Sequence, residues 1–335
     1  RLLDVMFRIL HSETAIRVFL WSHVVGTFYM GWTAFTSHGG GRFEGFRGPD
    51  ISEANAGALT LATGFIVLGA LFLASKWRPR AALAGMAPFL LEGIVRTMSR
   101  GGFLALVLGG TIFATLAPRP QRKVIWGLGL LAVAVFLALA NPQFWGRMAS
   151  IQYLGEDVEG TDTGSGRLVI MAGQIAMFKD QQWGYGHRAT PYLLPLYTGD
   201  FYLRGKEADE ATGASSHNTF MTLLVEQGVP GALFYLVLAS WTIRRLLLLR
   251  RRIGNSSAFD ELLLATVAAV MGAIWIGDMF VDYLKLEIRV WFIALLMAVG
   301  DLWLRSGKAE SEDRDDGAAE RDTVTTSPSF SGRAS

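Results

Sequence analysis

The chain has 335 residues, of which 51% are hydrophobic and only 18% are charged, and its formal net charge is +2. Soluble chains ordinarily carry about 25% charged residues, whereas here the apolar residues fall in blocks of about 20, the length at which a helix crosses a bilayer. The composition therefore excludes an ordinary soluble protein, and the absence of cysteine excludes disulfides, iron–sulfur clusters and cysteine-ligated zinc.

Eight apolar segments are long enough to cross a membrane as helices. We predict them at about 18–35, 54–74, 81–97, 103–117, 124–140, 219–243, 262–280 and 288–304, after an amphipathic lead-in on the membrane surface. Residues 141–217 form a long polar loop that is expected to be partly helical. Residues 305–335 have almost no apolar content, so they are expected to be a disordered tail. The predicted fold is an all-α polytopic membrane domain over residues 1–304.

Basic clusters mark one side of the membrane. They lie at 76–80, 119–123 and 244–252 and continue at Arg305 and Lys308. If every segment crosses once, all of them fall on the same face, which the positive-inside bias makes cytoplasmic. The opposite, exterior face then holds most of the polar residues that this topology does not explain. No internal repeat is visible, which argues against a transporter built from inverted repeats.

Ser216-His217-Asn218 stands where the long polar loop meets the sixth apolar segment. Near neutral pH, a histidine at this water boundary could accept a proton from a substrate hydroxyl. The alternative is an ordinary helix cap, in which Ser216 or Asn218 satisfies free backbone amides and His217 is merely exposed.

Two arginines on the exterior side could hold an anion. Arg100 lies in a Ser-Arg-Gly-Gly turn before a helix, where its planar donors and the free helix amides suit a phosphate and the glycines allow close approach. An arginine snorkelling to lipid headgroups is the alternative. Arg167 opens a predicted helix at 168–178, where a cation is disfavoured unless it holds an anion, although an ordinary surface arginine fits equally. With His217, the two arginines suit transfer from a phosphate leaving group.

These residues carry a resemblance to a known family. His217-Asn218, nine residues, then Gly228 and Gly231 resembles the hallmark of the bacterial O-antigen ligase and O-antigen polymerase family. Further matches in the same order are Ser99-Arg100-Gly101, Gly166-Arg167 and, more weakly, Trp183-Gly184-Tyr185-Gly186. The resemblance covers about residues 42–234. Asp50 departs from the family's Pro-Asn step. Eight spans are few for the family and the chain starts at Arg1, so we expect further helices upstream.

The resemblance implies a GT-C-like glycosyltransferase in the bacterial inner membrane with its active face in the periplasm. Members move a glycan from undecaprenyl pyrophosphate to a hydroxyl on a glycolipid such as lipid A-core, a growing polysaccharide or a protein, with no metal or cofactor and no nucleic acid. The motifs do not separate these acceptors. By position, Arg100 and Arg167 would hold the pyrophosphate and His217 would activate the acceptor. The implied substrate-binding residues are Arg42, Arg47, Asn218 and Tyr185.

A lipid or ion transporter that uses the acids Glu92, Asp278 and Asp282 is the competing function. The plainer explanation pairs Glu92 with Arg96 on one helix face and the two aspartates with Lys285 or Arg289. The acidic run at 156–162 could hold a divalent cation, although a solvated loop explains it more simply. Trp183–His187 could be a flexible platform under a sugar or a turn on the bilayer surface.

Overall fold

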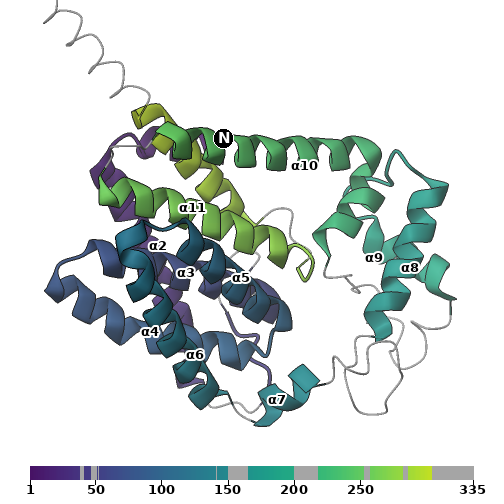
Figure 1. Cartoon of the computed structure of the whole chain (residues 1–335). Helices are drawn as coiled ribbons and strands as arrows, with labels where there is room; N and C mark the ends of the chain where they lie inside the picture. The colour runs from purple at the N-terminus through teal and green to yellow at the C-terminus, as the bar shows by residue number, and fades with distance from the viewer. Residues whose placement is uncertain are drawn as a thin grey trace, which may run out of the picture.

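The protein is described by a computed structural model over residues 1–37, 41–46, 51, 53–140, 142–149, 165–199, 218–252, 257–281 and 286–303, and every regular element within these ranges is helical (Figure 1). In chain order the elements are α1 (Leu2–Ile9), α2 (Glu13–Thr36), α3 (Ala54–Ala74), α4 (Trp77–Thr97), α5 (Arg100–Leu116), the 3-10 turn η1 (Arg119–Gln121), α6 (Arg122–Leu139), α7 (Pro142–Ala149), α8 (Ser165–Asp180), α9 (Thr190–Thr198), α10 (Thr219–Arg252) and α11 (Ala258–Gly277). Residues 287–303 are helical as well. The predicted tail at 305–335 lies outside the described residues.

Helix α3 lies at the centre of a bundle, with α2, α4, α5 and α11 packed around it. Its small residues allow this close approach, as is common where helices meet in membranes. A side chain at Gly64 would overlap with Thr27 of α2, and one at Gly57 would overlap with the ring of Phe46. All residues of α3 from Ala54 to Gly64 are consequently buried.

Several helices are suited to a bilayer. Among the described residues, α3, η1 with α6, α10 and α11 are each long and apolar enough to cross a membrane, and α5 is a shorter apolar helix. Helices α2 and α4 and the helix at 287–303 occupy the remaining predicted segments. The chain is thus a multi-pass membrane protein whose regular elements, over the described residues, are all helical, and the number of eight crossings stays a prediction.

The outward faces of α6 and α10 are apolar. Leu130 on α6 and Phe234 and Val237 on α10 are strongly exposed, and tryptophans 126 and 241 lie on the same two helices. Such continuous apolar surface is rare on soluble monomers. The surface is therefore suited to contact with lipid tails.

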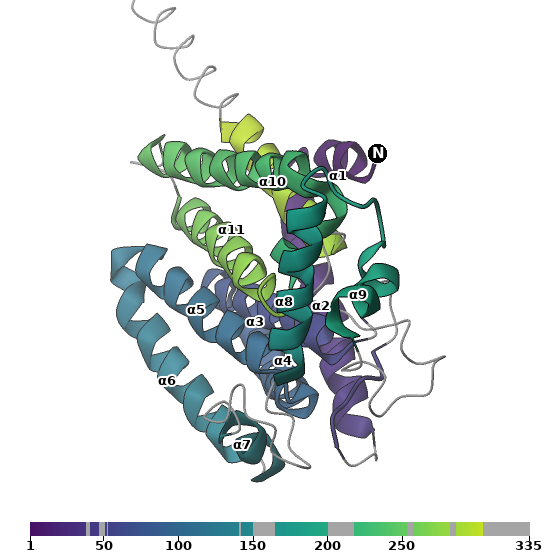
Figure 2. The same ribbon diagram turned by 90° about the vertical axis from the view of Figure 1, so that its right-hand side faces the viewer.

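Helices α8 and α9 form a smaller layer beside one end of the bundle, where they pack on each other and on α10 (Figures 1 and 2). Its own small core contains Met177, Leu194 and Val225, with Tyr185 and Tyr197 at the edge. The first turn of α8 contains the backbone of residue 167, as the sequence predicts. This layer faces the end of the bundle at which α5 begins and α11 finishes, hereafter the Arg100 end (Figure 1).

Candidate active site

Helix α5 begins with a buried serine cap. The Ser99 hydroxyl accepts a hydrogen bond from the Gly102 amide at 3.1 Å and donates one to the Asn55 carbonyl oxygen at 2.8 Å. Arg100 is therefore the first residue of a capped helix, half-buried, at the position where free amides and the helix dipole favour an anion.

The two glycines after Arg100 serve contacts between helices. A side chain at Gly101 would overlap with Phe280, just beyond α11, and one at Gly102 would overlap with Ala58 of α3. The sequence interpretation assigned these glycines to close approach of a ligand. The structure instead explains them by the tight packing of α5.

Arg42 is tied to the same end of the bundle. Its guanidinium donates to the Asn55 side-chain oxygen at 3.0 Å and lies 3.3 Å from the Glu44 carboxylate. Asn55 thereby accepts hydrogen bonds from both Arg42 and Ser99 and joins the loop after α2 to the start of α5. Arg47, the second predicted arginine of this loop, lies outside the described residues.

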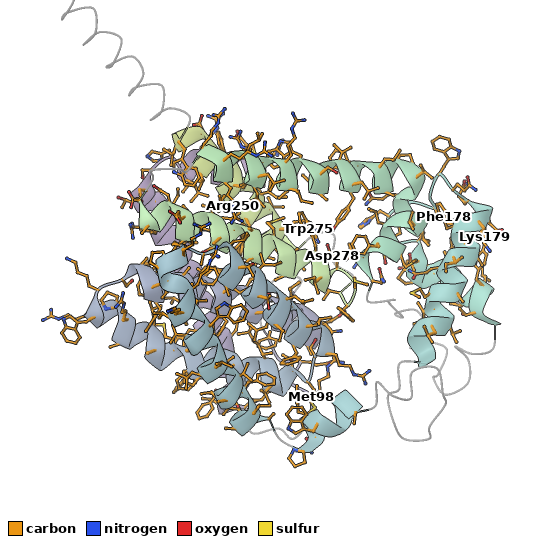
Figure 3. All side chains as sticks on the ribbon, viewed as in Figure 1. Met98, Phe178, Lys179, Arg250, Trp275 and Asp278 are labelled. Atoms are coloured by element: carbon orange, nitrogen blue, oxygen red, sulfur yellow. The ribbon has the colours of Figure 1, made fainter. Side chains whose placement is uncertain are left out.

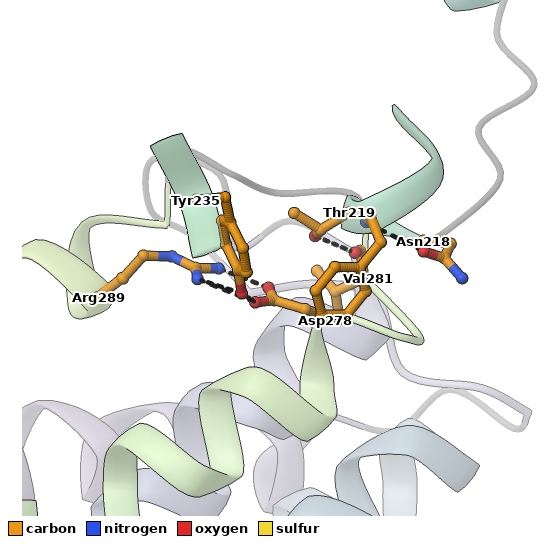
Figure 4. Close-up of polar contacts among 7 residues, drawn as sticks. Asn218, Thr219, Tyr235, Asp278, Val281 and Arg289 are labelled. Carbon is orange, nitrogen blue, oxygen red and sulfur yellow. Dashed lines mark hydrogen bonds and ion pairs between the residues drawn. The ribbon is translucent and has the colours of Figure 1, made fainter. Parts of the chain in front are cut away.

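The start of α10 is capped and anchored. The side-chain oxygen of Asn218 accepts the amide hydrogens of Phe220 and Met221 at 3.0 and 3.1 Å, so the interpretation of Asn218 as a helix cap is confirmed. Thr219 donates its amide to the Asp278 carbonyl at 2.8 Å and its hydroxyl to the Val281 carbonyl at 2.6 Å (Figure 4). His217 precedes this cap directly and lies outside the described residues.

A buried ion pair stabilises this attachment of the start of α10 to the segment that follows α11. Arg289 holds both carboxylate oxygens of Asp278, and the Tyr235 hydroxyl donates to the same carboxylate (Figure 4). The two charged side chains are 0% and 5% exposed. Because Tyr235 belongs to α10 and Asp278 follows α11, the pair connects both helices, and Figure 3 shows Asp278 at the end of α11 that faces the α8–α9 layer.

Two of the three acids assigned to a transporter are explained by ion pairs. Asp278 pairs with Arg289, one of the two partners proposed from the sequence. Glu92 accepts from Arg96 at 2.6 Å, again as expected. Asp282 and Lys285 lie outside the described residues.

Helix α10 bends sharply at Gly228, whose φ of 64° and ψ of −160° are not helical. The Trp183–Gly186 stretch fits against this bend. The Tyr185 and Gly186 amides donate to the Val225 and Glu226 carbonyls, and the Val229 amide donates to the Gln182 carbonyl, each at 2.9 Å. Two sequence motifs more than 40 residues apart thus form one packed unit, so of the two alternatives raised from the sequence the stretch is a packed turn rather than a flexible segment.

The glycines of both motifs are required by this contact. A side chain at Gly184 would overlap with the Glu226 carbonyl, and one at Gly228 would overlap with the Gln182 carbonyl. Tyr185, the predicted sugar contact, shares a hydrogen bond of 2.8 Å between its hydroxyl and that of Tyr197. The hydrogen bonds of Tyr197 with Tyr185 and then Asp180 raise the pKa of Tyr197 above its ordinary value.

Glu226 was not identified from the sequence, although an acid within an apolar helix is an available signal. It is 9% exposed, and its carboxylate accepts the Arg188 amide at 2.8 Å and the Thr190 amide at 3.5 Å. The His187 ring nitrogen Nδ1 lies 3.6 Å from the same carboxylate. Glu226 therefore holds the start of α9 against α10.

Three of the predicted residues that the structure places lie at the Arg100 end, namely Arg42, Arg100 and Asn218. Phe280 packs on Gly101 and is followed by Val281, which holds Thr219 at the start of α10. Arg42, Arg100 and Asn218 are thus connected through contacts of Asn55 and of their sequence neighbours, whereas Tyr185 belongs to the α8–α9 layer. The side chain of Arg167 lies outside the described residues, although its helix packs on α10.

Within the described ranges no group of three or more His, Asp or Glu side chains could hold a metal ion. The acidic run at 156–162 lies outside those ranges. The candidate site is thus characterised by two arginines, a helix start and the polar residues that fix them.

Comparison with known proteins identifies the central part of the chain. Residues 86–236 match a family model described as O-antigen ligase. This segment runs from α4 into α10 and contains the Arg100 turn, Arg167, the His217-Asn218 pair and the Gly228 bend. No curated protein matches the chain.

Proposed function

Because the chain belongs to the bacterial O-antigen ligase and polymerase family, with residues 86–236 as the matched segment, we propose that it moves a glycan from undecaprenyl pyrophosphate to a hydroxyl acceptor at the periplasmic face of the inner membrane. The proposed acceptor is a glycolipid such as lipid A-core, a growing polysaccharide or a protein side chain.

The observation that carries this proposal is the arrangement of Arg42 and Arg100 around Asn55 and Ser99. A glycan that leaves its carrier deposits negative charge on the pyrophosphate oxygens. Fixed guanidinium groups at a helix start stabilise such charge because they need no reorganisation as it develops. Both arginines lie at the Arg100 end, to which Thr219 also anchors the start of α10.

The proposed reaction is a direct displacement at the anomeric carbon. The acceptor oxygen forms the new bond to that carbon while the bond to the pyrophosphate oxygen breaks, and the electron pair stays on the pyrophosphate. Arg100 and Arg167 bind the leaving pyrophosphate, and His217 accepts the proton of the acceptor hydroxyl. Asn218 acts by fixing the backbone next to His217, because its side-chain oxygen is engaged in the cap.

Arg42, Arg47 and Tyr185 complete the proposed substrate contacts. In this proposal Arg42 adds its positive charge to that of Arg100 at a second phosphate oxygen. Tyr185 lies in the α8–α9 layer, where it would face the glycan rather than the lipid carrier. The proposal needs neither metal nor cofactor, because the guanidinium groups supply the positive charge.

Transfer by the full chain in lipid vesicles tests the proposal, with an undecaprenyl-pyrophosphate glycan as donor. Substitution of His217, Arg100 or Arg167 by alanine is expected to lower the transfer rate by about 10²-fold or more, the usual effect of removing a base or a charge-stabilising donor. Arg78→Ala is the matched control, because Arg78 is an exposed arginine at the opposite end of the bundle. Undiminished transfer in all three variants would refute the assignment.

A further inference from the structure

The last part of α10 carries a cluster of basic side chains, at the end of the helix that lies away from the α8–α9 layer (Figure 1). The cluster consists of Arg244, Arg245, Arg250, Arg251 and Arg252. Four of these side chains are exposed and Arg245 is half-buried. Within the described residues, none of the five guanidinium groups takes part in an ion pair or a hydrogen bond.

Other arginines at this end of the bundle are engaged by the chain itself. Arg80 donates to the Phe72 carbonyl near the end of α3 at 2.8 Å, and Arg122 donates to the Ala117 carbonyl after α5 at 3.0 Å. The arginines of α10 have no such use in the part of the chain that the structure describes. Their positive charge is therefore open to a partner.

Arg244 is the member of the cluster that helix structure does not explain. Arginines in the last turn of a helix interact favourably with the helix dipole, but this effect fades within one turn, and Arg244 lies about two turns before the end. From Val229 to Ile243 the helix has no charged residue. A charged side chain on such an apolar, lipid-facing helix is costly unless its guanidinium reaches the headgroups.

Arg244 shares one face of α10 with Leu247, Leu248 and Arg251, because residues three, four and seven positions apart lie on the same side of a helix. All four side chains are exposed, and the two leucines are 53% and 41% exposed. Leu249, on the opposite side, is buried. The outward face thus presents two arginines roughly 10 Å apart along the helix axis, with two leucines between them.

We propose that this face of α10 binds an anionic phospholipid, whose phosphate lies between Arg244 and Arg251 and whose acyl chains pack on Leu247 and Leu248. The planar donors of arginine suit a phosphate, and basic clusters at the end of a membrane helix attract anionic lipids. The acidic stretch at 310–322 of the same chain could balance the charge, but it would leave the leucines uncovered. A lipid satisfies both and continues the lipid-facing surface of α10.

Lipid binding to the full chain, purified in a nonionic detergent, tests the proposal by native mass spectrometry. Dioleoylphosphatidylglycerol is the probe, and dioleoylphosphatidylcholine is the reference because it has the same acyl chains without net charge. The phosphatidylglycerol that binds most tightly should have a dissociation constant about tenfold or more below that of phosphatidylcholine. Arg244→Gln with Arg251→Gln should raise it about 30-fold, because each arginine contributes about 1 kcal/mol near an anionic surface and 1.4 kcal/mol is a factor of ten.

Arg78→Gln with Arg119→Gln is the matched control. It removes two positive charges from exposed positions at the same end of the bundle, on α4 and η1, and should leave this dissociation constant nearly unchanged. The thermal unfolding midpoint in phosphatidylcholine should be the same in both double variants, because all four arginines are exposed. If the α10 double variant does not fold, Arg244→Gln alone replaces it, with an expected loss of about fivefold.

Four outcomes would overturn the proposal. An equal loss of affinity in the control would assign lipid binding to net charge rather than to this face. Phosphatidylglycerol bound no more tightly than phosphatidylcholine, or bound equally well by the α10 variant, would exclude the site. A changed oligomer mass of that variant with unaltered lipid binding would assign the face to a second copy of the chain. Displacement of the lipid by inorganic phosphate at equal concentration would identify a soluble anion as the ligand.

Discussion

Replacement of Gly228 by alanine should separate the α8–α9 layer from α10. The φ of 64° and ψ of −160° at Gly228 belong to a region populated almost only by glycine, and another residue there costs about 1–3 kcal/mol. An alanine methyl group would also overlap with backbone atoms of Gln182 and Trp183. Backbone atoms cannot rotate away as a flexible side chain can, so the contact itself has to open.

Opening this contact weakens three backbone hydrogen bonds, donated by the amides of Tyr185, Gly186 and Val229. Each such bond contributes about 0.5–1.5 kcal/mol to stability. Together with the backbone strain, the contact should lose about 3–5 kcal/mol. Because the core of the layer is small, local separation is expected before the bundle unfolds.

Hydrogen–deuterium exchange of these three amides is the appropriate assay. A loss of about 3–5 kcal/mol corresponds to exchange faster by about 10²-fold or more, because each 1.4 kcal/mol is a factor of ten. Gly127→Ala on the exposed face of α6 is the control, since a methyl group there meets no atom within 4 Å. It should be neutral or stabilising, by up to about 1 kcal/mol. Unchanged amide exchange in Gly228→Ala would refute this explanation of the bend.

Asp278→Asn leaves Arg289 buried without its counter-charge and should lower the free energy of chemical unfolding by about 3–5 kcal/mol. The double variant Asp278→Leu with Arg289→Met should recover most of this loss. Equal losses in the single and the double variant would contradict the ion-pair explanation. Gly101→Val should reduce the yield of folded protein because the side chain overlaps with Phe280, and Phe280→Ala in the same chain should restore part of it; no rescue would argue against this packing. Glu226→Gln should speed amide exchange at the start of α9 by about tenfold, because the amide there would lose a charged hydrogen-bond acceptor, and hydrogen bonds to charged acceptors are stronger than those to neutral ones. Amide exchange at the start of α5 serves as the internal reference. Equal changes in exchange at both places would exclude a local role of Glu226.

Features that depend on neighbouring residues could be predicted from the sequence. The limits of α3 agree with the apolar segment at 54–74, because the length of an apolar block is a local property. The Glu92–Arg96 pair follows from a spacing of one helical turn. The Asn218 cap follows from a polar residue directly before an apolar helix. The motif order likewise indicated the family that residues 86–236 match.

Contacts between distant segments could not be predicted in this way. The pattern around Gly228 marked a motif but not its union with Gly184, since either glycine alone is compatible with many turns. Sequence spacing left both Lys285 and Arg289 as partners of Asp278, and in the structure Asp278 pairs with Arg289 of the helix at 287–303.

The amino-acid sequence by itself indicated the helical membrane class, most helix positions, the family whose model residues 86–236 match, and the candidate residues Arg100, Arg167 and His217. Only the tertiary structure decided that Asn55 joins Arg42 to Ser99, which lies 44 positions after Asn55 in the chain. The physical reason is that helix length and capping depend on a few adjacent residues, whereas this network depends on which helix ends the folded bundle brings together.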